Sequence, residues 1–268
     1  MLLDAVVLVL REVLEAAFLV CVMLAFARLL AVPPRWMGMA LVLAGSGVLL
    51  YAGAMESMTD ALDGAGQEVV NAGLQLTVFA LIVAILGMGL AGHAGRRFGG
   101  QRSGAILGWL MAAAVGLALV RESAEILIYV QAFSAVEEYR LGVYAGSALG
   151  AGIGVSAGVL AWSALGALRP VPALRVCVLL LAIMGAGMVM QAALLLEQVD
   201  WLPAQQPLWD SSWLLGEQSL TGQLLFAVLG YEATPGPVQA ALYLGSLALA
   251  GLVVWLASRV EEDPDETH

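Results

Sequence analysis

Long runs of apolar residues dominate the pattern of the chain. Seven of these runs are long enough to cross a hydrocarbon core of about 30 Å as an α-helix, which takes about 20 residues. They lie at residues 2–28, 36–55, 69–92, 104–134, 141–167, 173–196 and 236–258. The pattern therefore predicts an all-α membrane protein with seven transmembrane helices.

The composition agrees with this prediction. Hydrophobic residues make up 61% of the chain, charged residues only 12%, and lysine is absent, while the mean hydropathy is +0.91. Such a composition excludes a soluble enzyme, and nothing in the sequence resembles a nucleic-acid-binding surface. We expect a multi-pass protein of the inner, cytoplasmic membrane that contacts the lipid bilayer, has no enzymatic activity, binds no cofactor and binds no nucleic acid. The first run carries three charges in its middle and has no basic segment before it, so we interpret it as a helix and not as a cleaved signal.

The arginines indicate how the chain is oriented. With the N-terminus outside and the C-terminus inside, the outer loops contain only Arg140. The inner side then receives Arg28, Arg35, Arg96, Arg97, Arg102, Arg169, Arg175 and Arg259. Because positive residues favour the cytoplasmic side, this is the orientation we predict.

Acidic residues gather on the predicted outer side, and the chain has a net charge of −10. One interpretation is an electrostatic funnel that concentrates cations at the outer mouth. The alternative is that acids accumulate where the positive-inside rule does not act. The candidates for cation capture are Glu56, Asp60, Asp63, Glu68 and Asp210.

Two of the apolar runs contain the same charged motif. Residues 11–15 read REVLE and residues 121–125 read RESAE. On a helix the arginine and both glutamates of each motif share one face, and the arginine can pair with the second glutamate one turn later. This pairing would leave Glu12 and Glu122 without a basic partner.

Buried charges at these positions need a compensating structure, since each costs about 2.5–3.5 kcal/mol inside a membrane. The four carboxylates outnumber the two guanidinium groups, which a bound cation or two protons would balance. Oxygen ligands of this kind suit hard cations. We therefore take Glu12, Glu15, Glu122 and Glu125 as candidate metal ligands, with Arg11 and Arg121 orienting them. The alternative is a purely structural role, in which two ion pairs hold the two helices together.

The two motifs also suggest an internal repeat. They lie on the first and fourth predicted helices, which run in opposite directions, as in a 3+3 inverted repeat. Repeat one would span 1–92 and repeat two 104–196, with ILGMG at 85–89 and IMGAG at 183–187 as a second match. Residues 197–235 would form an outer interfacial segment, and helix seven at 236–258 would complete a single domain, 1–258. Residues 259–268 would be an acidic cytoplasmic tail.

Glycines recur every four residues in the fifth run, from Gly142 to Gly158. They make one flat stripe on a helix, which favours close approach of a neighbouring backbone. A sliding surface or a contact between subunits would use the same stripe, and the partner could belong to the same chain or to another one.

The chain resembles the oxidase-dependent iron permeases, which include the fungal high-affinity ferric permease, the bacterial Efe-type iron transporters and related lead permeases. The likeness rests on the two RExxE motifs, on LWDSSWLL at 208–215 and on GQLLFAVLGYEATPG at 222–236. The family usually has REGLE, whereas this chain has Val13 in the first motif and Ser123 and Ala124 in the second.

The resemblance implies an iron permease that moves iron inward as its substrate. Glu12, Glu15, Glu122 and Glu125 would handle the iron, and an outer-face iron oxidase or iron-binding protein would deliver it. Two other functions stay open from the residues alone. One is a proton-coupled transporter or antiporter of another cation, including lead or another divalent metal, and the other is a membrane assembly subunit that transports nothing.

Overall fold

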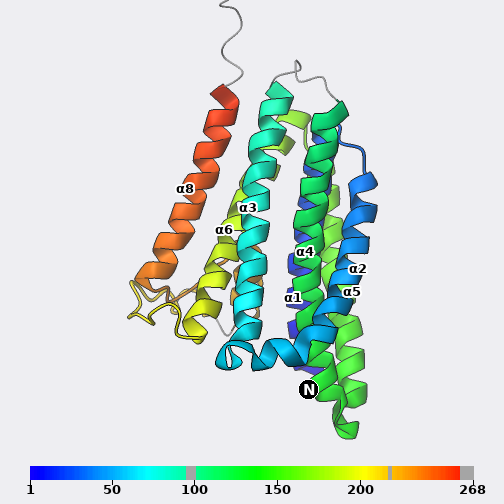
Figure 1. Ribbon diagram of the computed structural model, residues 1–268, viewed down its shortest axis with the longest axis vertical. Coiled ribbons are helices and arrows are strands. Elements are labelled where there is room, and N and C mark those ends of the chain that lie inside the picture. The colour runs from blue at the N-terminus through cyan, green and yellow to red at the C-terminus, as the bar shows by residue number, and fades with distance from the viewer. Residues whose placement is uncertain (95–100, 217–218, 260–268) are drawn as a thin grey trace, which may run out of the picture.

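The structure is a computed structural model that describes residues 1–94, 101–216 and 219–259, without the side chains of residues 56, 58–60, 93–94 and 101–103. In this part of the chain all regular structure is helical (Figure 1). The elements are α1 (Leu2–Leu29), α2 (Arg35–Asp60), the short 3-10 helix η1 (Ala61–Gly64), α3 (Gly66–Ala94), α4 (Gln101–Ser134), α5 (Glu137–Ala167), α6 (Pro170–Gln198), α7 (Leu220–Leu229) and α8 (Pro237–Arg259).

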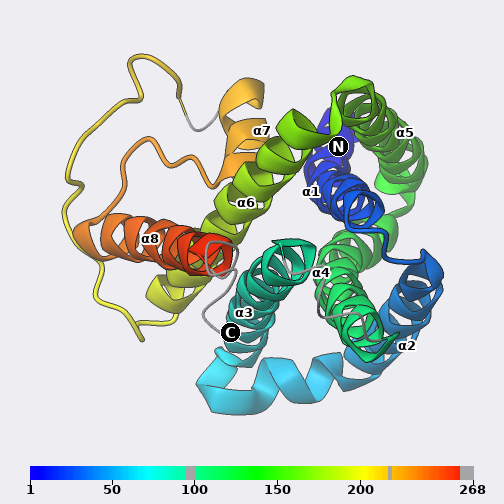
Figure 2. The same ribbon diagram turned by 90° about the horizontal axis from the view of Figure 1, so that it is seen from above.

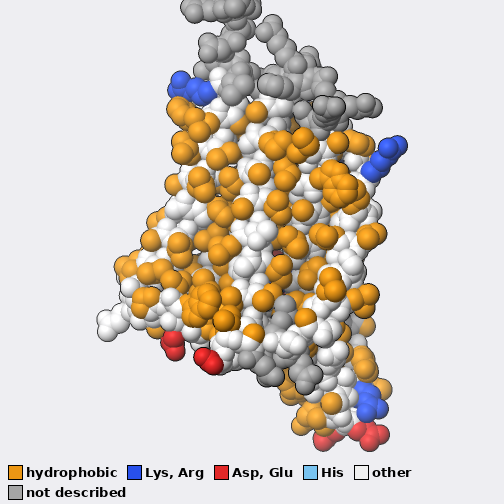
Figure 3. Space-filling model, viewed as in Figure 1, with side chains coloured by type: hydrophobic (Ala, Val, Ile, Leu, Met, Phe, Trp, Pro, Cys, Tyr) orange, Lys and Arg blue, Asp and Glu red, His pale blue; other side chains and the backbone are white. Residues whose placement is uncertain are grey.

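Six of the described helices are long and apolar enough to cross a membrane, namely α2, α3, α4, α5, α6 and α8. The helix α1 has 28 residues, but it carries Arg11, Glu12 and Glu15 in its middle. Apolar side chains cover the sides of the bundle, while charged side chains lie toward its two ends (Figure 3). These features support a multi-pass membrane protein.

The two ends of the bundle differ in charge. We call one the acidic end: it contains the N-terminus, η1, the α4–α5 turn and residues 199–216, and Asp4, Asp63, Glu68, Glu137, Glu138, Glu197, Asp200 and Asp210 lie there (Figure 1). The opposite, arginine end contains the α1–α2 turn, the start of α6 and the end of α8. Arg28, Arg35, Arg169, Arg175 and Arg259 lie there, while Arg140 lies at the acidic end. Arg96, Arg97, the side chain of Arg102 and tail residues 260–268 lie outside the described part.

The long helices pack in a repeated arrangement (Figure 2). The most extensive contact of α1 is with α5, that of α2 is with α4, and α3 packs against α6. The two motif helices α1 and α4 also contact each other and run in opposite directions. If α1 is exchanged with α4, α2 with α5 and α3 with α6, the α1–α5 pair becomes the α2–α4 pair. The α3–α6 pair and the α1–α4 pair stay as they are.

The glycine stripe of α5 lies against α1 of the same chain. A Cβ atom at Gly150 would come 2.5 Å from the Val6 carbonyl oxygen and 2.9 Å from the Leu10 nitrogen. Gly158 faces Ala17 in the same way, at 2.8 Å from its Cβ. The glycines therefore let two helix backbones approach closely, and the partner that the sequence left open is α1.

The hydrophobic core fills the half of the bundle toward the arginine end. It begins at Leu19, one turn after Glu15, and includes Phe26, Ile82, Met111 and Leu181, all of them almost completely buried. The motif residues lie between this core and the acidic end. Closely packed apolar side chains thus close the arginine side of the motif region.

Residues 199–216 form an irregular segment at the acidic end, with Trp201, Trp209 and Trp213 exposed. The following helix α7 begins at Ser219, whose hydroxyl accepts a hydrogen bond from the Gly222 amide, and ends at the left-handed Gly230. It packs against α1 and α6. The second half of the predicted interfacial segment is therefore part of the helical bundle.

Candidate cation site

The motif residues lie at the contact between α1 and α4. Glu12, Glu122, Glu15 and Arg121 are buried, with exposed fractions of 0%, 2%, 4% and 6%. The side chain of Glu125 is 23% exposed. The side chain of Arg11 is 33% exposed. Antiparallel packing of two helices with the same motif thus brings all six charged residues together.

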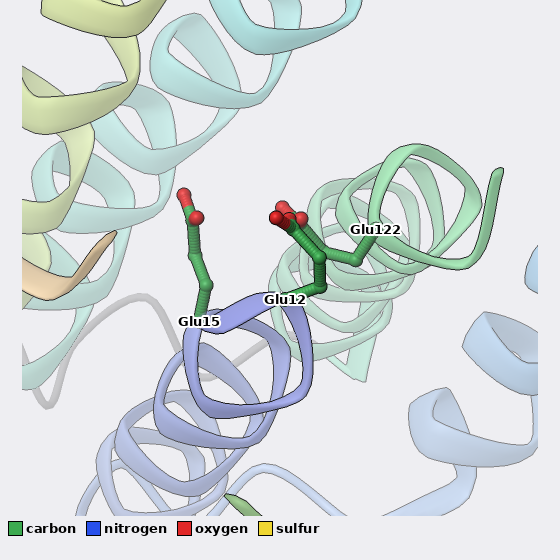
Figure 4. A group of neighbouring side chains, drawn as sticks. All are labelled: Glu12, Glu15 and Glu122. Carbon is green, nitrogen blue, oxygen red and sulfur yellow. The ribbon is translucent and has the colours of Figure 1, made fainter. Parts of the chain in front are cut away.

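Three of the four candidate glutamates form a compact group. One carboxylate oxygen from each of Glu12, Glu15 and Glu122 lies within 4.8 Å of the others. Figure 4 shows the Glu12 and Glu122 carboxyl groups meeting from two helices, with that of Glu15 beside them. Glu125 is not in this group. It lies at the edge, where it pairs with both arginines.

Arg121 joins three carboxylates. Its Nη1 lies 2.7 Å from Glu122 Oε1 and 3.3 Å from Glu15 Oε1, and its Nη2 lies 2.9 Å from Glu125 Oε1. A planar guanidinium with five N–H donors can serve several acceptors in this way. The pair between Arg121 and Glu125, one helical turn apart, confirms the pairing predicted for the second motif.

Arg11 behaves differently from the prediction. Its Nη2 lies 2.6 Å from Glu12 Oε1 and 3.7 Å from Glu125 Oε2 on α4. The expectation that Glu12 and Glu122 lack a basic partner is therefore wrong, since one oxygen of each is paired with the arginine that precedes it. The long Arg11 side chain reaches its neighbour on the same helix and a carboxylate on the facing helix. A helical wheel of one helix considers only residues three or four positions apart, so it does not predict these contacts.

The other oxygens of these two glutamates receive no hydrogen bond from an N–H or hydroxyl donor in the described part of the chain, and the two carboxyl groups lie within hydrogen-bonding reach of each other. These oxygens, Glu12 Oε2 and Glu122 Oε2, are both buried. Buried polar atoms are nearly always bonded, and a buried carboxylate oxygen is especially costly to leave alone. Two such oxygens, on carboxyl groups that face each other, are suited to hold a cation or a proton.

Two buried glutamines extend the group. Gln191 on α6 donates from Nε2 to Glu15 Oε1 at 2.9 Å, and Gln75 on α3 donates from Nε2 to Gln191 Oε1 at 2.6 Å. Sequence reasoning missed both residues. Their signal was available, because uncharged polar residues inside otherwise apolar membrane helices are uncommon and often functional.

Two cavities connect the motif residues to the acidic end. One, of about 380 Å³, is lined by Glu125 together with Glu68, Asn71 and Tyr129, and we call it the vestibule. The other, of about 660 Å³, is lined by Arg11 together with residues of α1, α6, α7 and the chain after α7. The partly exposed members of the group, Arg11 and Glu125, therefore line cavities at the end where the acids gather.

The predicted capture residues occupy different places. Glu68 lines the vestibule, whereas Asp63 and Asp210 are exposed and line neither cavity. Asp210 Oδ1 accepts a hydrogen bond from the Ser212 amide at 2.8 Å, and this bond holds the pKa of Asp210 below its usual value. The side chains of Glu56 and Asp60 lie outside the described part of the chain.

Comparisons with protein-family models, with curated proteins and with solved structures found no match.

Proposed function

We propose that this protein is an iron permease that moves iron ions inward across the cytoplasmic membrane through the site formed by Glu12, Glu15, Glu122 and Glu125. The observation that carries the proposal is the pair of facing carboxyl groups on Glu12 and Glu122, each with a buried oxygen that no N–H or hydroxyl group of the described residues reaches. Together with Glu15 they offer three carboxylate oxygens to one ion.

The charge of the site supports a cation as the ligand. Four carboxylates and two guanidinium groups leave an excess of two negative charges in a region that is largely closed to water. A cation removes this excess and gives the free oxygens a partner. Carboxylate oxygens favour hard cations, and the resemblance of the two RExxE motifs to those of the iron permeases supports iron among them.

The proposed route begins at the acidic end, which we take as the outer side. There an iron oxidase or iron-binding protein would deliver iron, Glu68 and the exposed acids would attract it, and the vestibule would lead it to Glu125 and the buried carboxylates. The apolar core beyond Leu19 closes the opposite side. In the proposed orientation, the cavities at the acidic end and the closed arginine end support an outward-facing arrangement.

Release on the inner side requires the helices to move. We propose that α1 is a seventh span, that α1–α3 and α4–α6 form two inverted repeats, and that rocking of one repeat against the other opens the arginine end. The exchange symmetry of the packing pairs α1–α5 and α2–α4 supports the repeat. Competition of Arg11 and Arg121 for the glutamates would help the iron to leave.

Uptake by purified protein in proteoliposomes tests the proposal. We expect iron to accumulate inside vesicles that contain the protein, and not inside empty vesicles, when iron(II) is supplied under anaerobic conditions or iron(III) as a soluble chelate. No accumulation of either form would contradict an iron permease.

A second candidate is a proton-coupled transporter of another cation, because two facing carboxyl groups can also share protons. The same vesicles loaded with a pH-sensitive dye distinguish the two functions. A pH change on addition of manganese(II) or lead(II), without iron accumulation, would favour the second candidate.

A further inference from the structure

The glutamine pair that reaches the carboxylate group forms a directed chain. Gln75 and Gln191 are 2% and 4% exposed, and each donates one hydrogen bond toward the site, Gln75 to Gln191 and Gln191 to Glu15. At the end of this hydrogen-bond chain away from the site, Gln75 Oε1 is buried without a hydrogen-bond partner in the described part of the protein. In the observed direction Gln75 therefore uses only its amide nitrogen, and its oxygen is free to accept a hydrogen bond if the amide turns.

The direction can reverse with little change in shape. The oxygen and nitrogen of a side-chain amide are nearly equal in size, and rotation about the last torsion exchanges them. After both amides turn, Gln191 Nε2 would donate to Gln75 Oε1, Gln75 Nε2 would take the unbonded place, and Gln191 Oε1 would face Glu15. Each direction thus leaves one amide atom of Gln75 unbonded. Against a bare carboxylate the contact of Gln191 Oε1 with Glu15 is repulsive, because two acceptors meet. With a cation beside Glu15 it becomes favourable, because amide and carboxylate oxygens are both ligands of hard cations.

We propose that Gln191 is a switching ligand of the cation site. It donates to Glu15 when no cation is bound, and it turns its carbonyl oxygen toward the cation when Glu15 binds one. Gln75 stabilises both orientations, first as donor and then as acceptor. This inference rests on the proposed cation site and adds to it a neutral ligand from α6.

A neutral ligand has a physical advantage at this site. It raises the number of oxygens around the ion without adding to the negative charge that must be overcome on release. The amide chain also joins α3 and α6 to the motif helix α1. Cation binding at the carboxylates would therefore change hydrogen bonds on two helices that carry no motif.

Binding of iron(II) to purified protein, measured by calorimetry under anaerobic conditions, tests the proposal. Gln191→Met keeps the size of the side chain but offers no hard ligand, and we expect the Kd to rise about 10–100-fold. Gln75→Met should raise the Kd less, because it removes only the support. Gln191→Glu supplies an oxygen but cannot donate to Glu15, and we expect its Kd to be no higher than that of the unchanged protein.

Gln239→Met is the matched control. Gln239 is also a buried glutamine, 5% exposed, and donates to a carboxylate, Glu197 Oε2, at 2.7 Å. It lies in the first turn of α8 and its hydrogen bonds go to Gly236 and Glu197, so its replacement should leave the Kd unchanged even where it lowers the melting temperature. A wild-type Kd for folded Gln191→Met would overturn the switching ligand, and so would an equal rise of the Kd in the Gln239→Met control.

Gln191→Glu and a double variant of the glutamates complete the test. If Gln191→Met does not fold, Gln191→Glu decides, since a Kd raised more than tenfold there would mean that the donated hydrogen bond matters and the oxygen does not. Protein with Glu12→Gln and Glu122→Gln distinguishes a failure of the cation site from a failure of the switching ligand. Normal iron(II) binding by this double variant contradicts the cation site itself, whereas its loss together with normal binding by Gln191→Met contradicts only the switching ligand.

Discussion

Arg121 and Arg11 occupy equivalent positions in the two motifs but have different surroundings. Arg121 is 6% exposed and contacts Glu15, Glu122 and Glu125. The Arg11 side chain is 33% exposed and lines the larger cavity, where water can approach it. At the scale of single residues, the site is therefore asymmetric, with one buried guanidinium at its centre and a second at its rim.

This asymmetry predicts unequal effects on stability. Arg121→Ala leaves buried carboxylates without their shared partner and should lower the free energy of unfolding by about 3–5 kcal/mol. Arg11→Ala should cost only about 1–2 kcal/mol, because water from the cavity can replace the guanidinium. Unfolding of the purified proteins by SDS titration measures both values, and equal losses would show that the two arginines are not distinguished by burial.

The acids at the acidic end should likewise differ from one another. Glu68 lines the vestibule with Glu125, whereas Asp63 is exposed in η1. Glu68→Gln should therefore raise the apparent KM for iron severalfold, and more at low ionic strength than at high, because the effect is partly a screened field. Asp63→Asn is the matched control and should change the KM less. The account of the vestibule fails if Asp63→Asn has the larger effect.

The sequence was sufficient to predict which charged residues meet, but not how they pair. Glu12, Glu15 and Glu122 come together because two equal motifs sit on neighbouring antiparallel helices, which the repeat already implied. The contact of Arg121 with Glu15 and that of Arg11 with Glu125 depend on the distance and rotation between the two helices, and these follow from packing. Gln191 reaches the site from a helix without a motif, so no local pattern connects it to Glu15.

At the scale of helices, the approach of α5 to α1 positions the first motif. A Cβ atom at Gly150 would meet the backbone of α1, at 2.5 Å from the Val6 carbonyl oxygen, and a backbone cannot yield as a side-chain end can. On the same helix, Gly152 has no atom within 4 Å of its Cβ position. Two glycines two residues apart thus differ completely in their surroundings.

Alanine substitutions exploit this difference. Gly150→Ala should destabilise the protein by about 1–3 kcal/mol through overpacking, and should reduce uptake because α1 is displaced. Gly152→Ala should leave stability unchanged or raise it slightly, because alanine favours the helix. Melting temperatures in detergent provide the comparison, and a Gly150→Ala protein as stable as the unchanged one would exclude a tight α1–α5 contact.

Helix positions were largely predictable, and helix ends were not. Residues 36–55 were expected as a span, but α2 continues to Asp60, and α3 begins at Gly66 where the expected span began at residue 69. Apolar runs mark the part of a helix suited to hydrocarbon, whereas backbone hydrogen bonds continue into polar residues beyond it. The packing of α7 against α1 and α6 has no counterpart in the local pattern.

At the scale of the whole molecule, the separation of acids and arginines gives a clear expectation for orientation. Asp63→Cys and Ala204→Cys at the acidic end should react with a membrane-impermeant maleimide in intact cells, and Leu168→Cys at the arginine end should react only after the membrane is opened. All three positions are exposed, and Cys21 and Cys177 are replaced by alanine in this background. Labelling of Leu168→Cys alone in intact cells would reverse the orientation and with it the proposed direction of transport.

The central claim is that Glu12 and Glu122 hold the transported cation. Glu12→Gln together with Glu122→Gln keeps the size of both side chains and one oxygen in each, but removes the charge that offsets the desolvation of the metal. Glu137→Gln together with Glu138→Gln, at two exposed acids that begin α5, is the matched control.

Iron uptake into proteoliposomes by these two folded double variants is the most direct test. We expect the changes at Glu12 and Glu122 to abolish iron uptake, and the changes at Glu137 and Glu138 to leave it in place. Normal iron uptake by a well-folded Glu12→Gln, Glu122→Gln protein would contradict the cation site and leave the buried charges with a structural role.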